Sequence, residues 1–118
     1  MGKRTTPQLD AKGDCYRANG RLFLDLCNAN PVLEPTTRLC HGWVTPREGK
    51  DAGRCFHHAW VELQDDVVFD HCNGGRVTMR RLEYYRAGRI DETLVVRYRF
   101  LEVLERLVLH EGWSLGSV

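Results

Sequence analysis

A predicted β-hairpin at the centre of the chain constrains the fold more than any other segment. Residues 55–63 and 67–70 are rich in β-branched and aromatic side chains, and the polar segment 64–66 separates them. The turn sequence Asn73-Gly74-Gly75 ends the second strand just past Asp70. The two runs therefore predict neighbouring antiparallel strands, which fixes the residues that can meet across them.

Alternation divides the side chains of the first of these strands between two faces. His58, Trp60 and Glu62 share one face, and residues 57, 59, 61 and 63 share the other, which we expect to be buried against a helix. Asp70 lies on the neighbouring strand, where its carboxylate can accept a proton from Nδ1 of His58. An aspartate beside the apolar run 67–69 is costly to bury without such a partner. The hairpin thus predicts a His58–Asp70 pair.

The flanking segments predict a single α+β domain, in which an N-terminal helix packs on a small antiparallel sheet followed by C-terminal helices. The polar residues 1–13 are expected to form a flexible arm, and residues 14–118 the domain. The periodicity predicts helices over 15–28 and 76–87 and a last helix that begins at Phe100 and stops before Gly112, with further strands over 38–44 and 93–98. One face of the last helix is predicted to carry Phe100, Leu101, Leu104, Leu107 and Val108.

Composition narrows the classes of function. A net charge of +1 gives no strong attraction to nucleic acid or to an anionic membrane. No apolar run approaches the roughly 20 residues that span a bilayer, and no signal-peptide segment follows residues 1–7, so we expect a cytoplasmic protein. The 5 cysteines are an odd number, so they cannot form a complete set of disulfides within one chain. In a reducing compartment most are expected to be thiols.

Cys15 has the position of a nucleophile. It follows Asp14, a predicted N-cap, and the N-terminus of a helix favours the thiolate over the thiol. In chain order, Cys15 precedes His58 and Asp70, and a thiol, an imidazole and a carboxylate are the parts of a cysteine nucleophile with its base and the group that orients the base. The alternative is that Cys15 is an apolar residue of the helix core.

The segment His58-Ala59-Trp60-Val61-Glu62, with Asp70 after a β-turn, resembles the His and Asp segment of the papain-like/transglutaminase-like cysteine hydrolase superfamily. In that superfamily a cysteine on a helix comes first in the chain. More loosely, the chain from Asp14-Cys15-Tyr16 to Glu111-Gly112-Trp113 is similar to small uncharacterised bacterial and phage proteins with this core. The chain lacks the substrate-binding domains of larger members, which leaves its substrate open.

The resemblance implies Cys15 as nucleophile, His58 as general base and Asp70 as its orienter. Gln8 resembles the glutamine that papain-type enzymes place before their cysteine, and would add to an oxyanion hole with the backbone N–H of Cys15. Tyr16 and Trp60 are the candidate substrate-cleft residues. The implied reactions are hydrolysis of a peptide or isopeptide, deamidation and transamidation, on a protein, peptide or small amide, with no cofactor.

Two other classes of function remain open. A zinc-binding domain would draw its ligands from Cys55, His57, His71 and Cys72, although no Cys-x-x-Cys pair is present. A non-catalytic binding protein on the same fold would use the arginines of residues 76–89 with Tyr84 and Tyr85. A solvated helix face accounts for these arginines better, so nucleic acid is not an expected partner.

Overall fold

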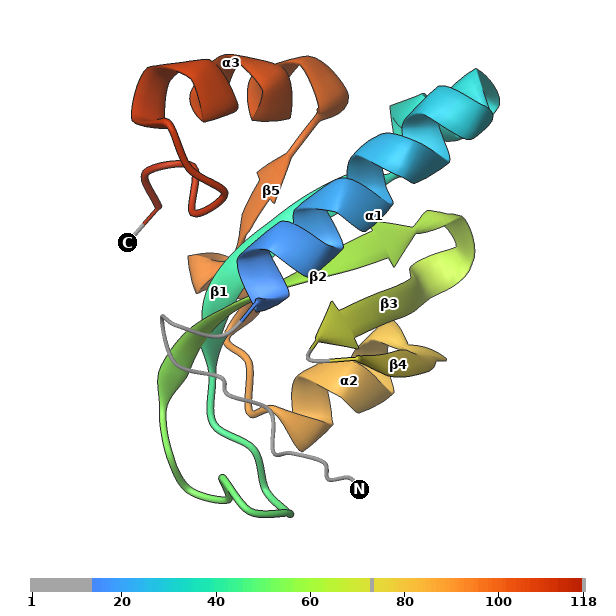
Figure 1. Cartoon of the computed structure of the whole chain (residues 1–118). Helices are drawn as coiled ribbons and strands as arrows, with labels where there is room; N and C mark the ends of the chain where they lie inside the picture. Colours follow the sequence, from blue (N-terminus) through green and yellow to red (C-terminus); the bar gives the residue numbers. More distant parts are fainter. Residues whose placement is uncertain (1–13, 73, 118) are drawn as a thin grey trace.

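The computed structural model describes residues 14–72 and 74–117, and these form an α+β fold. Within them, antiparallel strands make a 5-stranded sheet in the order β4-β3-β2-β1-β5 (Figure 1). The strands are β1 (Arg38–Val44), β2 (Phe56–Leu63), β3 (Val67–Cys72), β4 (Gly75–Arg80) and β5 (Val96–Tyr98). The helices are α1 (Cys15–Ala29), α2 (Arg81–Ala87) and α3 (Phe100–His110), with short 3₁₀ turns at Pro31–Thr36, Gln64–Asp66 and Glu92–Leu94.

Helix α1 lies across one face of the sheet and presents one side to it (Figure 1). Its buried residues Cys15, Asn19, Phe23 and Cys27 recur every fourth position, which places them on one side of the helix. Gly20 is required for packing, because a Cβ there would come within 2.4 Å of the Trp113 ring. Through these contacts the helix is fixed on the sheet, with its first residue over the β2–β3 region.

The two faces of the sheet carry separate apolar cores, of which only the one that contains Val61 was predicted. Val61 belongs to the core under α1 and α3, together with Phe23, Leu39, Tyr98 and Val103. Trp60 belongs to the core on the α2 side, together with Cys40, Val44, Phe56, Val68 and Tyr85. His58 has the same parity as Trp60 and so lies on the α2 side of β2.

Glu62 is a buried carboxylate that ties β2 to α2 and β5. It accepts hydrogen bonds from Trp60 Nε1 at 3.0 Å and from the Tyr85 hydroxyl, and it pairs with Arg97 Nε at 3.0 Å. Burial opposes its ionisation, but these donors, Tyr85 first, hold its pKa below the ordinary value. Trp60 is thus fixed in the core by its ring nitrogen as well as by packing.

Two sequence predictions of secondary structure are wrong. Residues 76–80 were predicted to be helical but form β4, which pairs with β3 from Cys72↔Gly75 to Val67↔Arg80. The β-branched pair Val77-Thr78 after a glycine turn favours this hairpin over a helix. The predicted strand 93–98 is shorter, because residues 92–94 form a 3₁₀ turn.

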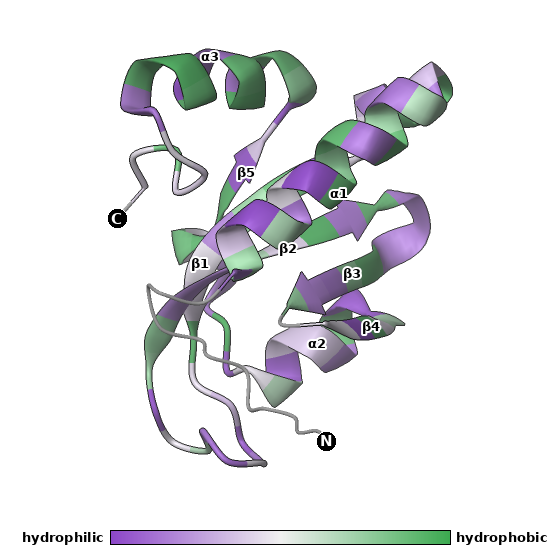
Figure 2. Cartoon of the chain, viewed as in Figure 1, coloured by the Kyte–Doolittle hydropathy of each residue, from purple (hydrophilic) through white to green (hydrophobic). Residues whose placement is uncertain are grey.

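The buried side of α3 also differs from the prediction. Val103 is fully buried, and Phe100 and Leu107 pack beside it. Leu101, Leu104 and Val108 are exposed, which is visible as apolar colour along α3 in Figure 2. The apolar residues of α3 form a broad stripe, so periodicity alone could not select which part of it is buried.

Candidate active site

The β2–β3 hairpin is paired near its turn and open at its far end. The ladder joins Leu63↔Val67, Glu62↔Val68 and Val61↔Phe69 and does not continue toward His58. If the register continued, Ala59 would lie opposite His71. Instead, the N-terminal end of α1 meets the hairpin here, where α1 contacts both β2 and β3.

Asn19 makes the hydrogen bonds that the open strands cannot make with each other. Its Nδ2 donates to the backbone oxygen of Ala59 at 3.0 Å, and its Oδ1 accepts from the backbone N–H of His71 at 2.8 Å. The same Nδ2 lies 3.1 Å from both the backbone oxygen of Cys15 and Oδ1 of Asp70. One buried amide therefore satisfies both strands and links the helix to the hairpin.

Asp70 and His58 form a buried pair. Oδ2 of Asp70 accepts from Nε2 of His58 at 2.8 Å and from the Tyr84 hydroxyl at 2.6 Å, while Oδ1 faces Asn19. The prediction of a contact through Nδ1 is wrong, since Nε2 is the nitrogen that meets Asp70. Nδ1 is buried and has no hydrogen-bond partner in the part of the chain that the structure describes. It is the nitrogen left to face Cys15.

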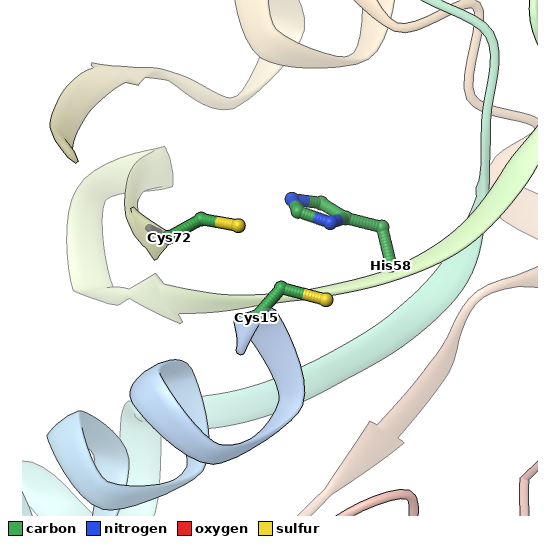
Figure 3. A group of neighbouring side chains, drawn as sticks. All are labelled: Cys15, His58 and Cys72. Carbon is green, nitrogen blue, oxygen red and sulfur yellow. The ribbon is translucent and has the colours of Figure 1, made fainter. Parts of the chain in front are cut away.

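Two thiols and an imidazole meet where α1 begins (Figure 3). The sulfurs of Cys15 and Cys72 and a ring nitrogen of His58 all lie within 4.8 Å of one another. Cys15 comes from the first residue of α1, His58 from β2 and Cys72 from the last residue of β3. The structure therefore places the three residues of the predicted triad next to one another, in the order Cys15, His58, Asp70. It also places a second thiol, that of Cys72, beside them.

The charges of the group favour a thiolate beside an imidazolium. Hydrogen bonding with the Cys72 thiol, together with smaller contributions from His58 and the Ala59 backbone, outweighs the effect of burial and lowers the pKa of Cys15 to about 5. Burial lowers the pKa of His58, but the charge and hydrogen bond of Asp70 outweigh it and raise this pKa to about 10. Asp70 also stays ionised, because His58 offsets the cost of its burial and keeps its pKa low. Near neutral pH, Cys15 is thus the anion and His58 the cation.

An apolar cavity of about 350 Å³ adjoins the triad. Its polar walls are His58, Asp70 and Cys72, and the first two are engaged with each other. The remaining walls include Val44, Phe56, Val77, Met79, Tyr84 and Ile90. Because the walls offer few polar partners, the cavity suits an uncharged, apolar group.

The other predicted site residues lie elsewhere. Gln8 is outside the described residues. Tyr16 turns toward the opposite side of the sheet, where its hydroxyl lies 2.6 Å from Nδ1 of His57. Trp60 is fully buried in the core and is not among the residues that line the cavity, so the prediction that it lines a substrate cleft is wrong.

The predicted zinc ligands do not converge. Among residues 14–72 and 74–117, the one group of three or more potential ligands is Cys15, His58 and Cys72, while Cys55 is exposed and His57 contacts Tyr16. The prediction of a site built from Cys55, His57, His71 and Cys72 is therefore wrong. The three residues that do meet have sulfur and imidazole donors, which suit a thiophilic ion such as Zn²⁺.

Three residues lie at the site although the sequence does not predict them there: Asn19, Tyr84 and Cys72. Asn19 carries the clearest signal, since it is a poor helix former placed four residues after Cys15 on the same side of the helix. Cys72 follows Asp70 by two residues, so alternation puts both on one face of β3. Tyr84 offers no local signal, because the packing of α2 sets its position.

No protein-family model, curated protein or solved structure matches the chain. The resemblance to the papain-like/transglutaminase-like superfamily therefore stays a prediction, and the geometry carries the functional argument. No helix within the described ranges has the length and apolar character needed to cross a bilayer.

Proposed function

We propose that the protein is a cysteine-dependent acyl-transfer enzyme with a papain-like/transglutaminase-like core. The observation that carries this proposal is the order of contacts from Cys15 through His58 to Asp70, with Asp70 held by its own donors. Each member has the protonation state that the chemistry requires, because Cys15 favours the thiolate and His58 the imidazolium. The bonds of Asp70 to Asn19 and Tyr84 fix the direction in which the imidazole is held.

In this mechanism the thiolate of Cys15 attacks an acyl carbon and His58 gives its proton to the leaving amine. The oxyanion forms near the first backbone N–H groups of α1, which have no partner within the helix. His58 then removes a proton from water or from an amine, which attacks the acyl-enzyme and releases Cys15. Hydrolysis, deamidation and transamidation share these steps and differ in the groups that leave and accept.

The cavity supports a substrate with an apolar group next to its acyl carbon. His58 and Cys72 line the cavity and also lie within 4.8 Å of the Cys15 sulfur, so the cavity borders the reacting atoms. Cys15 itself has no exposed surface. Turnover therefore requires a movement that opens a path to its sulfur, and the cavity is the described opening next to it. We propose a protein, peptide or small amide as substrate.

The state of the cysteines supports a reducing compartment as the location of this reaction. None of the 5 cysteines is in a disulfide, and a reducing compartment such as the cytoplasm keeps both Cys15 and its neighbour reduced.

Trapping of the acyl-enzyme tests this proposal. The protein is mixed with an activated ester that has an apolar acyl group, and intact mass with peptide mapping locates the adduct. We expect one acyl group on Cys15 and its slow loss to water or to an added amine. The exposed Cys55 provides the matched control, so Cys55→Ala should keep the adduct while Cys15→Ala should lose it.

Asp70→Asn in the same assay should slow acylation by about 100-fold or more, because the imidazole would lose its charged partner. Labelling spread over several cysteines, or equal rates in the parent and the Asp70→Asn protein, would instead support a non-catalytic binding protein. Protection of Cys15 that a chelator removes would indicate a bound thiophilic ion.

A further inference from the structure

Cys72 forms and breaks no bond in the acyl steps, yet its sulfur lies beside the nucleophile and hydrogen bonding with it favours the Cys15 thiolate. It is the last residue of β3 and lies on the same face as Asp70. Figure 3 shows its side chain directed toward the space that Cys15 and His58 share. The three reactive atoms lie within 4.8 Å of one another, so a small shift would bring the two sulfurs into contact.

The two thiols are in opposite chemical states. Their mutual hydrogen bonding lowers the pKa of Cys15 and raises the pKa of Cys72, so the pair shares one negative charge, which resides on Cys15. A thiolate attacks an oxidant, whereas a neighbouring thiol can attack the oxidised sulfur that results. The helix N-terminus adds to this asymmetry, because it favours the anion at Cys15 and not at Cys72.

We infer that Cys15 and Cys72 form a redox modification site, in which a small hydroperoxide oxidises Cys15 and Cys72 closes the product to a disulfide. The inference rests on the reactive Cys15 of the proposed function but on none of its acyl steps. The disulfide would hold the nucleophile inactive until a dithiol reduced it. It would also protect Cys15 from irreversible oxidation.

The chemistry balances within the group. The Cys15 thiolate attacks one peroxide oxygen, the O–O bond breaks, and the leaving alkoxide or hydroxide takes the proton of the His58 imidazolium. Cys15 is then a sulfenic acid. The Cys72 sulfur attacks it, the S–O bond breaks, and His58 passes the Cys72 proton to the leaving hydroxide as water. The peroxide is reduced by two electrons, and the two thiols are oxidised by two electrons.

The surroundings permit both steps. Cys72 borders the cavity of about 350 Å³, which gives a small oxidant a route to the group. A disulfide needs the sulfurs to close to about 2.05 Å, and both cysteines are at the ends of their elements, where small shifts cost least. The other buried cysteines, Cys27 and Cys40, have pKa values raised by burial and are poor competitors.

Peroxide titration followed by mass spectrometry tests the inference. The reduced protein is treated with a few equivalents of hydrogen peroxide at neutral pH, remaining thiols are blocked with iodoacetamide, and intact mass and peptide mapping are recorded. We expect a loss of two hydrogen atoms, a mapped Cys15–Cys72 link, and full reversal by dithiothreitol. Cys55→Ser serves as the matched control and should give the same link.

Cys72→Ser should form no link and should instead gain oxygen on Cys15, with the sulfenic acid trapped by dimedone. The inference is overturned if parent Cys15 gains oxygen without joining Cys72, or if Cys72→Ser loses two hydrogen atoms as the parent does. Alkylation of Cys15 in reduced Cys72→Ser protein is measured in parallel. If alkylation remains selective while no disulfide forms in the parent, the redox inference fails and the proposed function stands.

Discussion

The two halves of the β2–β3 hairpin differ in what holds the strands together. Near the turn, backbone pairs such as Val61↔Phe69 close the ladder and apolar side chains cover it on both faces. At the open end, a side-chain amide from α1 replaces the ladder, and the Cys15 sulfur lies near His58 of β2 and Cys72 of β3. The comparison indicates that the paired half supplies stability, whereas the open half gathers the ionisable side chains. Because the two halves share the same strands, the paired half holds His58, Asp70 and Cys72 in place.

Disruption of the paired half should have the largest effect. Val61 is fully buried in the core beneath α1, so Val61→Asp would place an unpaired charge there. We expect a loss of about 4 kcal/mol or more in the free energy of unfolding, which is enough to unfold a small domain. Thermal melting or urea denaturation measures it.

Val96→Asp is the control for this substitution, because Val96 is an exposed valine on the edge strand β5. It should change stability by less than about 0.5 kcal/mol. A Val61→Asp protein that melts within a degree or two of the Val96→Asp protein would contradict the assignment of the faces.

Disruption of the open half should cost less stability but should change the chemistry. Asn19→Ala removes buried hydrogen bonds to Ala59, His71 and Asp70, which is worth about 3 kcal/mol. Asn28→Ala alters an exposed asparagine of the same helix and should be nearly neutral. Alkylation of Cys15 should slow in the first variant only. If Asn19→Ala lost stability without any change at Cys15, the amide would be purely structural.

A substitution in the cavity beside the open half should have the smallest effect, and this effect should be confined to substrate binding. Val77 lines the cavity, is half-exposed and lies on the edge strand β4, so Val77→Asp adds a charge there without disturbing the core. We expect acylation by an ester with an apolar acyl group to slow by about tenfold, because one extra polar mismatch costs roughly 1 to 3 kcal/mol in an apolar pocket. Acetylation by a small ester should be unchanged.

Val96→Asp again provides a matched exposed valine on the opposite edge of the sheet. Equal rates for long and short acyl groups in the Val77→Asp protein and its control would remove the cavity from the substrate site.

The sequence predicts the members of the triad but not what holds them. Strand alternation and the hairpin turn are local properties, so His58 and Asp70 could be placed on neighbouring strands from residues 55–75 alone. The opening of the ladder depends on where α1 docks, which is a tertiary property, and Asn19 therefore could not be assigned a role in advance. The ring nitrogen that meets Asp70 depends on a side-chain rotation that no periodicity encodes.

The pH dependence of Cys15 alkylation tests the central claim, a thiolate at Cys15 paired with His58, most directly. The rate at Cys15 is followed by peptide mapping with iodoacetamide from acidic to neutral pH, in the parent, in His58→Ala and in His57→Ala. The groups that face the Cys15 sulfur are His58 and Cys72, with Asp70 behind His58. With the pKa of Cys15 at about 5, the parent should already react near its full rate at about pH 6.

His58→Ala removes the cation, so the pKa of Cys15 should rise, although the hydrogen bond with Cys72 keeps it below its free value, and the rate at about pH 6 should fall roughly tenfold or more. The fraction of Cys15 in the thiolate form should fall by a larger factor than the rate does. A more basic thiolate is a better nucleophile, which offsets part of the loss. His57→Ala, a change at the adjacent histidine on the other face of β2, should keep the parent profile. Coinciding profiles for the parent and His58→Ala would contradict the ion pair and, with it, the proposed enzyme.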